Sequence, residues 1–157
     1  MASSKKRNKA YRPKALITNP LSFVFSGMQR IEGEHLTDLQ VKNHSAMYEM
    51  VQGRGTRDGW DKLVGMINMS IVICELGTGA EYHAELLAGR DALYSVCVRY
   101  RSIGKFIFTG DEMNAMNTAL QIHDAQLEIS RVIDIERATD EVIRRIRTGV
   151  NLKRVCA

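Results

Sequence analysis

The sequence predicts an all-α fold: an antiparallel bundle of four to five helices with one long C-terminal helix and a disordered basic N-terminal arm. Three observations lead to this prediction. Apolar side chains recur with a spacing near 3.6 residues through most of the chain. Glycines close these periodic segments, where helices commonly end. The segments are joined by short turns, which favour antiparallel neighbours.

The first two helices are predicted from a start signal and from periodicity. Asn19 is suited to cap free backbone N–H groups and Pro20 to occupy a first helical position, so we expect a short helix over 20–26. A second helix is expected over 34–52, with a lapse of the apolar pattern at Asn43, and it is closed by Gly53.

Two longer helices follow in the middle of the chain. Thr56 offers an N-cap for a stripe of apolar residues that runs from position 60 to 74 and stops before Gly77. The next periodic segment covers 82–103 and stops at Gly104. Residues 105–108 are typical of a short extended connector, since a strand there would need a partner strand that the pattern does not supply.

The last periodic segment predicts the longest helix. Thr109 and Glu112 have the spacing of a capping box. Beyond them neither Gly nor Pro occurs until Gly149. We therefore predict one long helix, bent midway, which at about 1.5 Å per residue would exceed about 50 Å.

The composition is that of one globular domain, which we place at 15–157, after an arm over 1–14. The 157 residues are 45% hydrophobic and 25% charged, as is usual for such domains. Cys74, Cys97 and Cys156 show no C-x-x-C spacing, which favours a reducing, cytoplasmic location. Apolar runs are far shorter than the roughly 20 residues of a membrane-spanning helix, so we expect no membrane partner.

Positive charge is concentrated in the arm. Residues 1–14 hold six basic residues and no acid, and the rest of the chain has 16 basic and 18 acidic residues. Such an arm attracts phosphate through counterion release, and Tyr11 could stack on a base. An acidic protein surface as its target, or a purely solubilising role, stays open. The basic residues of the arm are Lys5, Lys6, Arg7, Lys9, Arg12 and Lys14.

A second basic cluster ends the chain. It consists of Arg144, Arg145, Arg147, Lys153 and Arg154. Basic residues near a helix C-terminus interact favourably with the helix dipole, which accounts for most of them. If both basic ends lay on one side of the bundle, they would form a face that binds nucleic acid or an acidic partner.

Polar residues inside the apolar pattern mark a further candidate site, a polar interface of Asn43, His44 and His123. His123 follows Met116 by seven residues, so it should face the core or an interface. It is either a hydrogen-bonded core histidine or a buried polar contact at a partner surface. Buried amides such as Asn43 commonly fix helix register.

Motifs of catalysis and cofactor binding are missing from the sequence. A single Glu-x-x-His spacing, at Glu32 and His35, is interrupted by Gly33, so we predict no metal site. The turn at 53–56 lacks the ending of a P-loop, and there is no Gly-x-Ser-x-Gly elbow or dinucleotide fingerprint. We therefore predict no cofactor and no enzyme of a known class; a hydrolase or transferase that uses His44 or His123 is a third function class.

Several phrases of the sequence resemble small proteins encoded by phages and integrated mobile elements of proteobacteria. They are the basic start followed by Asn19 and Pro20, the run Val41–Met47 and the run His123–Glu128. The resemblance covers most of the chain and implies no site residues. It does imply a role in binding, either in regulating the element's genes or in blocking a host machine.

The leading functional prediction is a non-enzymatic phage or mobile-element interaction protein. It would bind and modulate, by inhibition, a host or element-encoded protein complex, of which a nucleic-acid-handling or defence complex is one specific version. The alternative is a direct nucleic-acid-binding regulator (of DNA or RNA) that uses the arm and the C-terminal basic cluster. A homodimer stays open, because the apolar positions of the last segment are not strict heptads.

Overall fold

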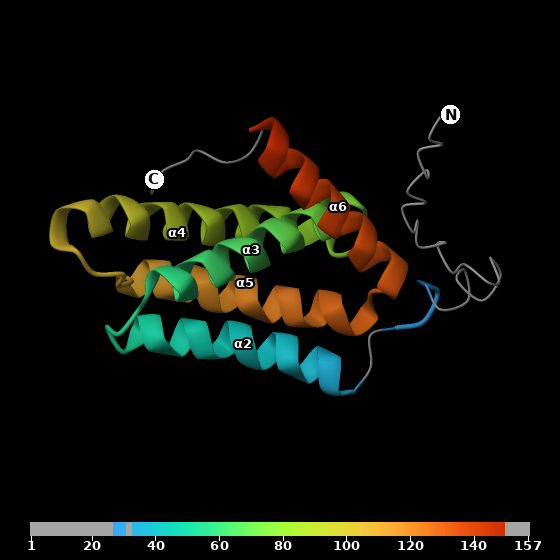
Figure 1. The fold of residues 1–157 in the computed structure, drawn as a ribbon, viewed down its shortest axis with the longest axis horizontal. Helices are drawn as coiled ribbons and strands as arrows, with labels where there is room; N and C mark the ends of the chain where they lie inside the picture. Colours follow the sequence, from blue (N-terminus) through green and yellow to red (C-terminus); the bar gives the residue numbers. More distant parts are fainter. Residues whose placement is uncertain (1–26, 31–32, 150–157) are drawn as a thin grey trace, which may run out of the picture.

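The computed structural model describes residues 27–30 and 33–149. Its elements are α2 (Glu34–Val51), α3 (Arg57–Glu75), the short 3₁₀ helix η1 (Ala80–Tyr82), α4 (His83–Ile103), α5 (Gly110–Ile129) and α6 (Val132–Thr148). Helices α2 to α5 lie side by side, and α6 crosses over α3 (Figure 1). The all-α prediction is therefore confirmed. The predicted arm over 1–14 and the predicted helix over 20–26 lie outside the described residues.

Local sequence signals set most of the helix ends. The Thr56 hydroxyl accepts a hydrogen bond of 3.0 Å from the backbone N–H of Gly59, so it caps α3. The capping box predicted at Thr109 and Glu112 is present, with the Thr109 N–H donating to Glu112 Oε2 at 2.8 Å. Helix α4 ends at Gly104, whose φ of 68° is left-handed backbone that favours glycine.

The prediction of one long C-terminal helix is wrong, because the chain breaks between α5 and α6. Ser130 and Arg131 have extended backbone, with ψ of 147° and 156°. The N–H of Val132 donates to the carbonyl of Gln29 at 2.8 Å, and Arg30 and Arg131 form an isolated antiparallel bridge. Contacts distant in sequence therefore interrupt a segment that has no local helix breaker.

The connector over 105–108 closes one end of the molecule. Phe106 pairs with Gly55 in an isolated antiparallel bridge, so the loop between α2 and α3 supplies the partner that the sequence pattern does not. Gly55 is required there, because a Cβ would lie 2.6 Å from the carbonyl oxygen of Phe106. The Phe106 ring stacks on Tyr100 at 4.1 Å and lies 6.1 Å from Trp60.

The main apolar core lies between α2, α3, α4 and α5. Its largest fully buried side chains include Met50, Leu63, Ile67, Leu86, Met116 and Leu120. Gly89 lets α4 approach α5 closely, since a Cβ there would lie only 2.8 Å from Ala119 Cβ. These four helices form a tightly packed body.

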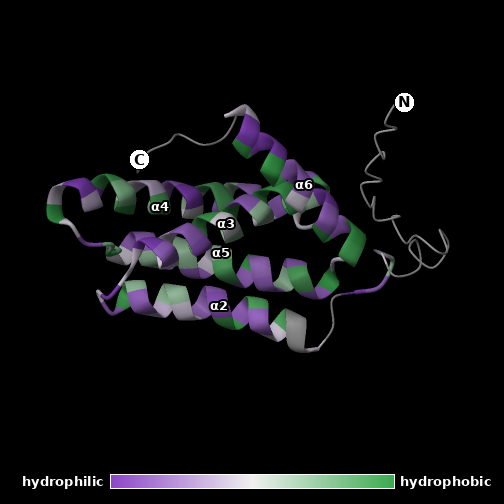
Figure 2. Cartoon of the chain, in the orientation of Figure 1, coloured by the Kyte–Doolittle hydropathy of each residue, from purple (hydrophilic) through white to green (hydrophobic). Residues whose placement is uncertain are grey.

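Helix α6 is attached to that body by a much smaller cluster. Val72 and Ile73 of α3 and Ala138 of α6 are buried in it, and Ile135 and Val142 pack against them. Apolar and polar residues alternate along α6 (Figure 2), and Ala138 is its only fully buried residue. Because α6 packs chiefly on α3, it leaves a groove between itself and α4.

Candidate interaction groove

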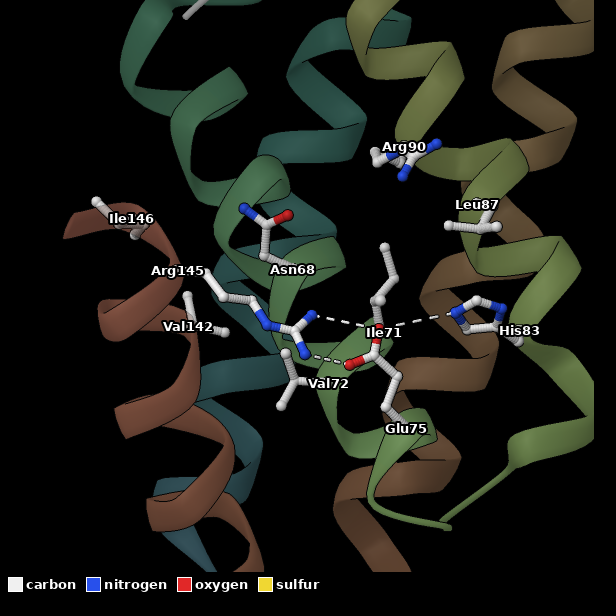
Figure 3. A pocket seen from close by; sticks show the side chains of 10 residues that line it. All are labelled: Asn68, Ile71, Val72, Glu75, His83, Leu87, Arg90, Val142, Arg145 and Ile146. Atoms are coloured by element: carbon white, nitrogen blue, oxygen red, sulfur yellow. Dashed lines mark hydrogen bonds and ion pairs between the residues drawn. The ribbon is translucent and has the colours of Figure 1, made fainter. Parts of the chain in front are cut away.

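A groove of about 240 Å³ lies between α3, α4 and α6. Helix α3 forms its floor, and the other two helices form its walls (Figure 3). The lining residues are Asn68, Ile71, Val72 and Glu75 of α3, His83, Leu87 and Arg90 of α4, and Val142, Arg145 and Ile146 of α6. We refer to this set of ten residues as the groove.

The size of the groove decides what it can hold. Pockets for small-molecule ligands usually measure about 300–1,000 Å³, so 240 Å³ is small for a cofactor or a drug-sized substrate. An apolar cavity of about 150 Å³ is enough for a benzene molecule. The groove can therefore receive about one aromatic or two aliphatic side chains.

An ion pair occupies the floor of the groove. The Glu75 carboxylate accepts hydrogen bonds from both terminal nitrogens of Arg145, one of them at 3.2 Å. His83 Nε2 lies 3.9 Å from Glu75 Oε1 on the opposite wall (Figure 3). Arg145 also donates from Nε to Glu141 Oε1 at 2.6 Å. The charge of Glu75 is thus compensated, and the floor is not a free acidic site.

These contacts shift the pKa values of the charged groups on α6. The hydrogen bonds to Glu75 and then to Glu141 raise the pKa of the Arg145 guanidinium. The hydrogen bonds from Arg144 and then from Arg145 lower the pKa of the Glu141 carboxyl to about 2. Glu141 and Arg145 therefore stay ionised at neutral pH.

Arg90 supplies a cation at the rim of the groove. It donates to Asp91 Oδ1 at 2.9 Å, and the Asp91 side chain is 70% exposed. Surface ion pairs of this kind contribute only about 0–1 kcal/mol, so Arg90 can exchange this partner for another carboxylate. Together with the apolar side chains of Ile71, Leu87 and Ile146, it gives the groove an apolar strip beside the ion pair and a positive charge at the edge.

A second polar cluster lies inside the core, between α3 and α5. Ser70 Oγ and His123 Nδ1 share a hydrogen bond of 2.7 Å. The side-chain amide of Gln126 donates to the carbonyl oxygens of Ser70, at 3.2 Å, and Thr78, at 3.0 Å. Nearby, Cys74 Sγ donates to the carbonyl of Gly79 at 2.8 Å. This cluster joins α3 to α5 and to the turn after α3.

Burial sets the chemistry of this inner cluster. His123 is only 4% exposed, and desolvation lowers the pKa of its imidazole to about 4, against a smaller opposing effect of the Asp124 charge. His123 is therefore a neutral, hydrogen-bonded core residue. Ser70 is also fully buried, so the Ser70–His123 pair is closed to any substrate that approaches from solvent.

The predicted polar interface of Asn43, His44 and His123 is not one continuous surface. His44 lies exposed on the outside of α2, where its Nε2 is 2.7 Å from Asp124 Oδ2. Asn43 is half-buried on the same helix. His123 faces α3 instead, so only its neighbour Asp124 connects the two regions.

The described part of the basic cluster carries less free positive charge than its sequence indicates. Arg144 donates to Glu141 at 2.7 Å, and Arg145 is bound by Glu75 and Glu141, whereas Arg147 is exposed. The other predicted binding residues, Lys5, Lys6, Arg7, Lys9, Tyr11, Arg12, Lys14, Lys153 and Arg154, lie outside the described residues.

Sequence reasoning missed the groove. Glu75 and Arg145 are 70 positions apart, and no spacing signal links them to His83 or to Arg90. One weak sequence signal for the groove is the strong amphipathicity of the helix that becomes α6. Its apolar face is wider than the contact with α3, so Ile143 and Ile146 remain exposed.

Comparisons with known proteins give this chain no relative. The part of it that the structure describes contains no group of three or more His, Cys, Asp or Glu side chains placed to hold a metal ion. None of the helices in that part is long and apolar enough to cross a membrane. The chain matches no protein-family model, and it has no match among curated proteins or among solved structures.

Proposed function

We propose that this chain is a non-enzymatic interaction protein of a phage or mobile element, which binds and inhibits a host or element-encoded protein complex. The groove between α3, α4 and α6 is the observation that supports this proposal. It is too small for a typical ligand and large enough for the side chains of a protein partner.

The chemistry of the groove indicates what the partner presents. The apolar side chains of Ile71, Leu87 and Ile146 line part of it beside the Glu75–Arg145 ion pair, and its rim carries Arg90. A partner segment with one or two large apolar residues and a neighbouring carboxylate would satisfy both features. Burying one such side chain fully contributes about 1.5–3 kcal/mol, and the carboxylate sets the orientation.

Binding of a partner segment in the groove would itself inhibit the partner complex. A partner segment held in the groove is unavailable to its own complex, and the helices around the groove block the space beside it. Because both walls are formed by regular helices, little ordering of the backbone accompanies binding. The proposal therefore needs no conformational change in this chain.

The experiment is a tagged pull-down from a lysate of the bacterium that carries the gene, with nuclease treatment. It compares the wild-type chain with Leu87→Glu, which places a charge on the apolar wall, and with Arg90→Glu, which reverses the rim charge. Ala88→Glu is the matched control, because Ala88 is exposed on the same helix and does not line the groove. Circular dichroism verifies that all four proteins are folded.

The proposal predicts a stoichiometric protein that survives nuclease treatment, is lost with both groove variants and is retained with Ala88→Glu. Equal recovery by Leu87→Glu and the wild type would refute the groove as the binding site. Loss of all recovery after nuclease treatment would refute protein docking altogether.

The second candidate is direct binding of nucleic acid, which the basic composition of residues 1–14 favours. It predicts an affinity that falls steeply with salt and drops when residues 1–14 are removed. Leu87→Glu would leave that affinity unchanged, so the same variant separates the two functions.

A further inference from the structure

The first half of α6 carries an open hollow of about 320 Å³ that shares no residue with the groove. It is lined by Val132, Ile135, Glu136, Thr139 and Asp140, and no residue of another described element lines it. The five residues stand at positions i, i+3, i+4, i+7 and i+8, so they share one face of the helix. Apolar and hydroxyl side chains form one edge of this face and two carboxylates form the other. We refer to these five residues as the outer face of α6.

The two carboxylates of the outer face have no counterion in the described part of the chain. Neither the Glu136 nor the Asp140 side chain forms a hydrogen bond or an ion pair with another described residue, and both residues are exposed. Asp134 and Glu141 on the same helix, by contrast, are each paired with an arginine, at 2.9 Å and 2.7 Å. Two like charges four positions apart on a helix repel each other. The outer face therefore favours a cationic neighbour.

The N-terminal part of the chain reaches α6 at Gly27. Gly27 is buried, and a Cβ at this position would lie 3.4 Å from Ile133 Cβ, which is ordinary van der Waals contact. An isolated antiparallel bridge joins Arg30 to Arg131, so the chain after Gly27 runs antiparallel to the start of α6. Followed back from Gly27 in the same direction, the chain leads from Ile133 along the outer face. Residues 20–26 are therefore the segment best placed to cover this face.

Residues 20–26 match the outer face in length and in pattern. The sequence predicts a helix there, and seven positions of a helix cover about 10 Å, which is close to the length of the outer face. Phe23 and Val24 stand four and three positions before Gly27, so in this helix they share the side that meets α6. Phe25 stands two positions before Gly27, which is the opposite side of the same helix. Two large apolar side chains are thus available for the apolar edge of the outer face.

The charge of the preceding residues is opposite to that of the outer face. No acidic residue occurs in 1–31, whereas 1–14 hold six basic residues, of which Arg12 and Lys14 are the last. The six positions from Lys14 to Pro20 can span up to about 20 Å, which is enough to bring its ammonium group to either carboxylate. The counterions that the two carboxylates lack are therefore available from the same chain.

We propose that residues 20–26 pack on the outer face of α6 through Phe23 and Val24, and that basic residues of 1–14 pair with its two carboxylates. The segment then holds α6, which has only one fully buried residue of its own, on the rest of the molecule. Cations paired in this way are withheld from phosphate, so the contact competes with nucleic-acid binding by residues 1–14. The inference does not depend on a partner in the groove.

Hydrogen–deuterium exchange of the full chain, followed at the amides of α6, tests the apolar contact. Phe23→Asp should accelerate exchange in α6 by at least about tenfold, because the burial of one large apolar side chain slows a local opening by that much or more. Phe25→Asp is the matched control. It places the same charge in the same segment on the opposite side of the predicted helix, so α6 should exchange as in the wild type. Exchange in α4 is the internal reference and should change in neither variant.

Equal exchange of α6 in the wild type and in Phe23→Asp overturns the proposal. Acceleration of the same size in Phe25→Asp overturns the assignment of Phe23 and Val24 to the contact.

Zero-length cross-linking with a carbodiimide, which joins a lysine amine to a carboxylate in contact with it, tests the charge pairing. In the monomeric full chain the dominant product should join a lysine of 1–14 to Glu136 or Asp140. Phe23→Asp should lower its yield severalfold, and Phe25→Asp should not. Equal yields at other exposed carboxylates, such as Asp38 and Asp111, overturn the pairing. A product found only between two chains overturns the intramolecular contact and assigns the outer face to a second copy.

Discussion

Helix α3 carries two polar clusters that use similar groups and differ in burial. The inner cluster joins Ser70 to His123 and Gln126, and the outer cluster joins Glu75 to Arg145 and His83. Desolvation keeps the inner histidine neutral and fixes its partners. The outer groups remain in contact with water, and Glu75 and Arg145 form an ion pair there. The inner cluster therefore determines how the helices pack, while the outer one lies at the surface of the groove.

The largest expected effect is the response of the inner cluster to acid. The pKa of His123 is about 4 in the folded state against about 6.5 when unfolded, so between these values the unfolded chain binds more protons. The contribution of neutral His123 to the free energy of unfolding is complete above pH 6.5 and is lost as the pH falls towards 4. Urea unfolding across this window should show a loss of about 3 kcal/mol from this residue.

His123→Gln is the control for this effect. The variant removes the titrating group, so its free energy of unfolding should fall less between pH 6.5 and 4 than that of the wild type. Identical slopes for both proteins would show that His123 is not buried as a neutral group.

The next effect concerns Gln126, whose amide joins α3, α5 and the turn at Thr78. Gln126→Leu keeps the volume of the side chain and leaves the carbonyl oxygens of Ser70 and Thr78 without this donor. We expect a loss of about 2 kcal/mol in the free energy of unfolding, measured by denaturation at neutral pH. A variant as stable as the wild type would mean that the inner cluster does not determine packing.

Substitutions at two glycines compare a buried helix contact with an exposed helix surface. Gly89→Ala forces a Cβ to within 2.8 Å of Ala119 Cβ, so the overpacking should destabilise the fold by about 1–3 kcal/mol. Gly65→Ala, on the exposed side of α3, meets nothing within 4 Å and should stabilise the helix by up to about 1 kcal/mol. Thermal unfolding of the two variants should therefore shift in opposite directions. A shared direction would contradict the close approach of α4 and α5.

The smallest effect is expected in the outer cluster. Glu75→Gln weakens the ion pair with Arg145, but both groups are partly exposed and Arg145 keeps Glu141. The loss of stability should stay below about 1 kcal/mol and shrink further at high salt. If Glu75→Gln lost as much free energy of unfolding as Gln126→Leu, the Glu75–Arg145 ion pair would be a main support of the groove.

The sequence was enough to predict the features that depend on neighbouring residues. Residues a few positions apart determine the helix caps at Thr56 and Thr109 and the helix end at Gly104. The apolar periodicity was enough to predict that His123 faces the core or an interface. The break at Ser130 depends on a pairing with residues 29 and 30, about 100 positions earlier, and no local residue signals it. The hydrogen bond between His123 and Ser70 could not be predicted either, because the two residues are distant in the sequence.

The groove could not be predicted, because it exists only through the crossing of α6 over α3. Its charged pair joins positions 75 and 145, and its rim residue Arg90 is one of many exposed arginines in the sequence. Periodicity identifies which face of a helix is apolar, but the angle at which two faces meet depends on packing.

The most direct test of the central claim is photo-crosslinking at the groove. A photoreactive residue replaces Leu87 in one protein and Ala88 in another, and both are irradiated in cells of the native host. If the groove binds a protein partner, the probe at position 87 should yield one dominant cross-linked protein that the probe at position 88 does not. Equal cross-linking at both positions, or none at position 87, would contradict the claim that the groove is the binding site.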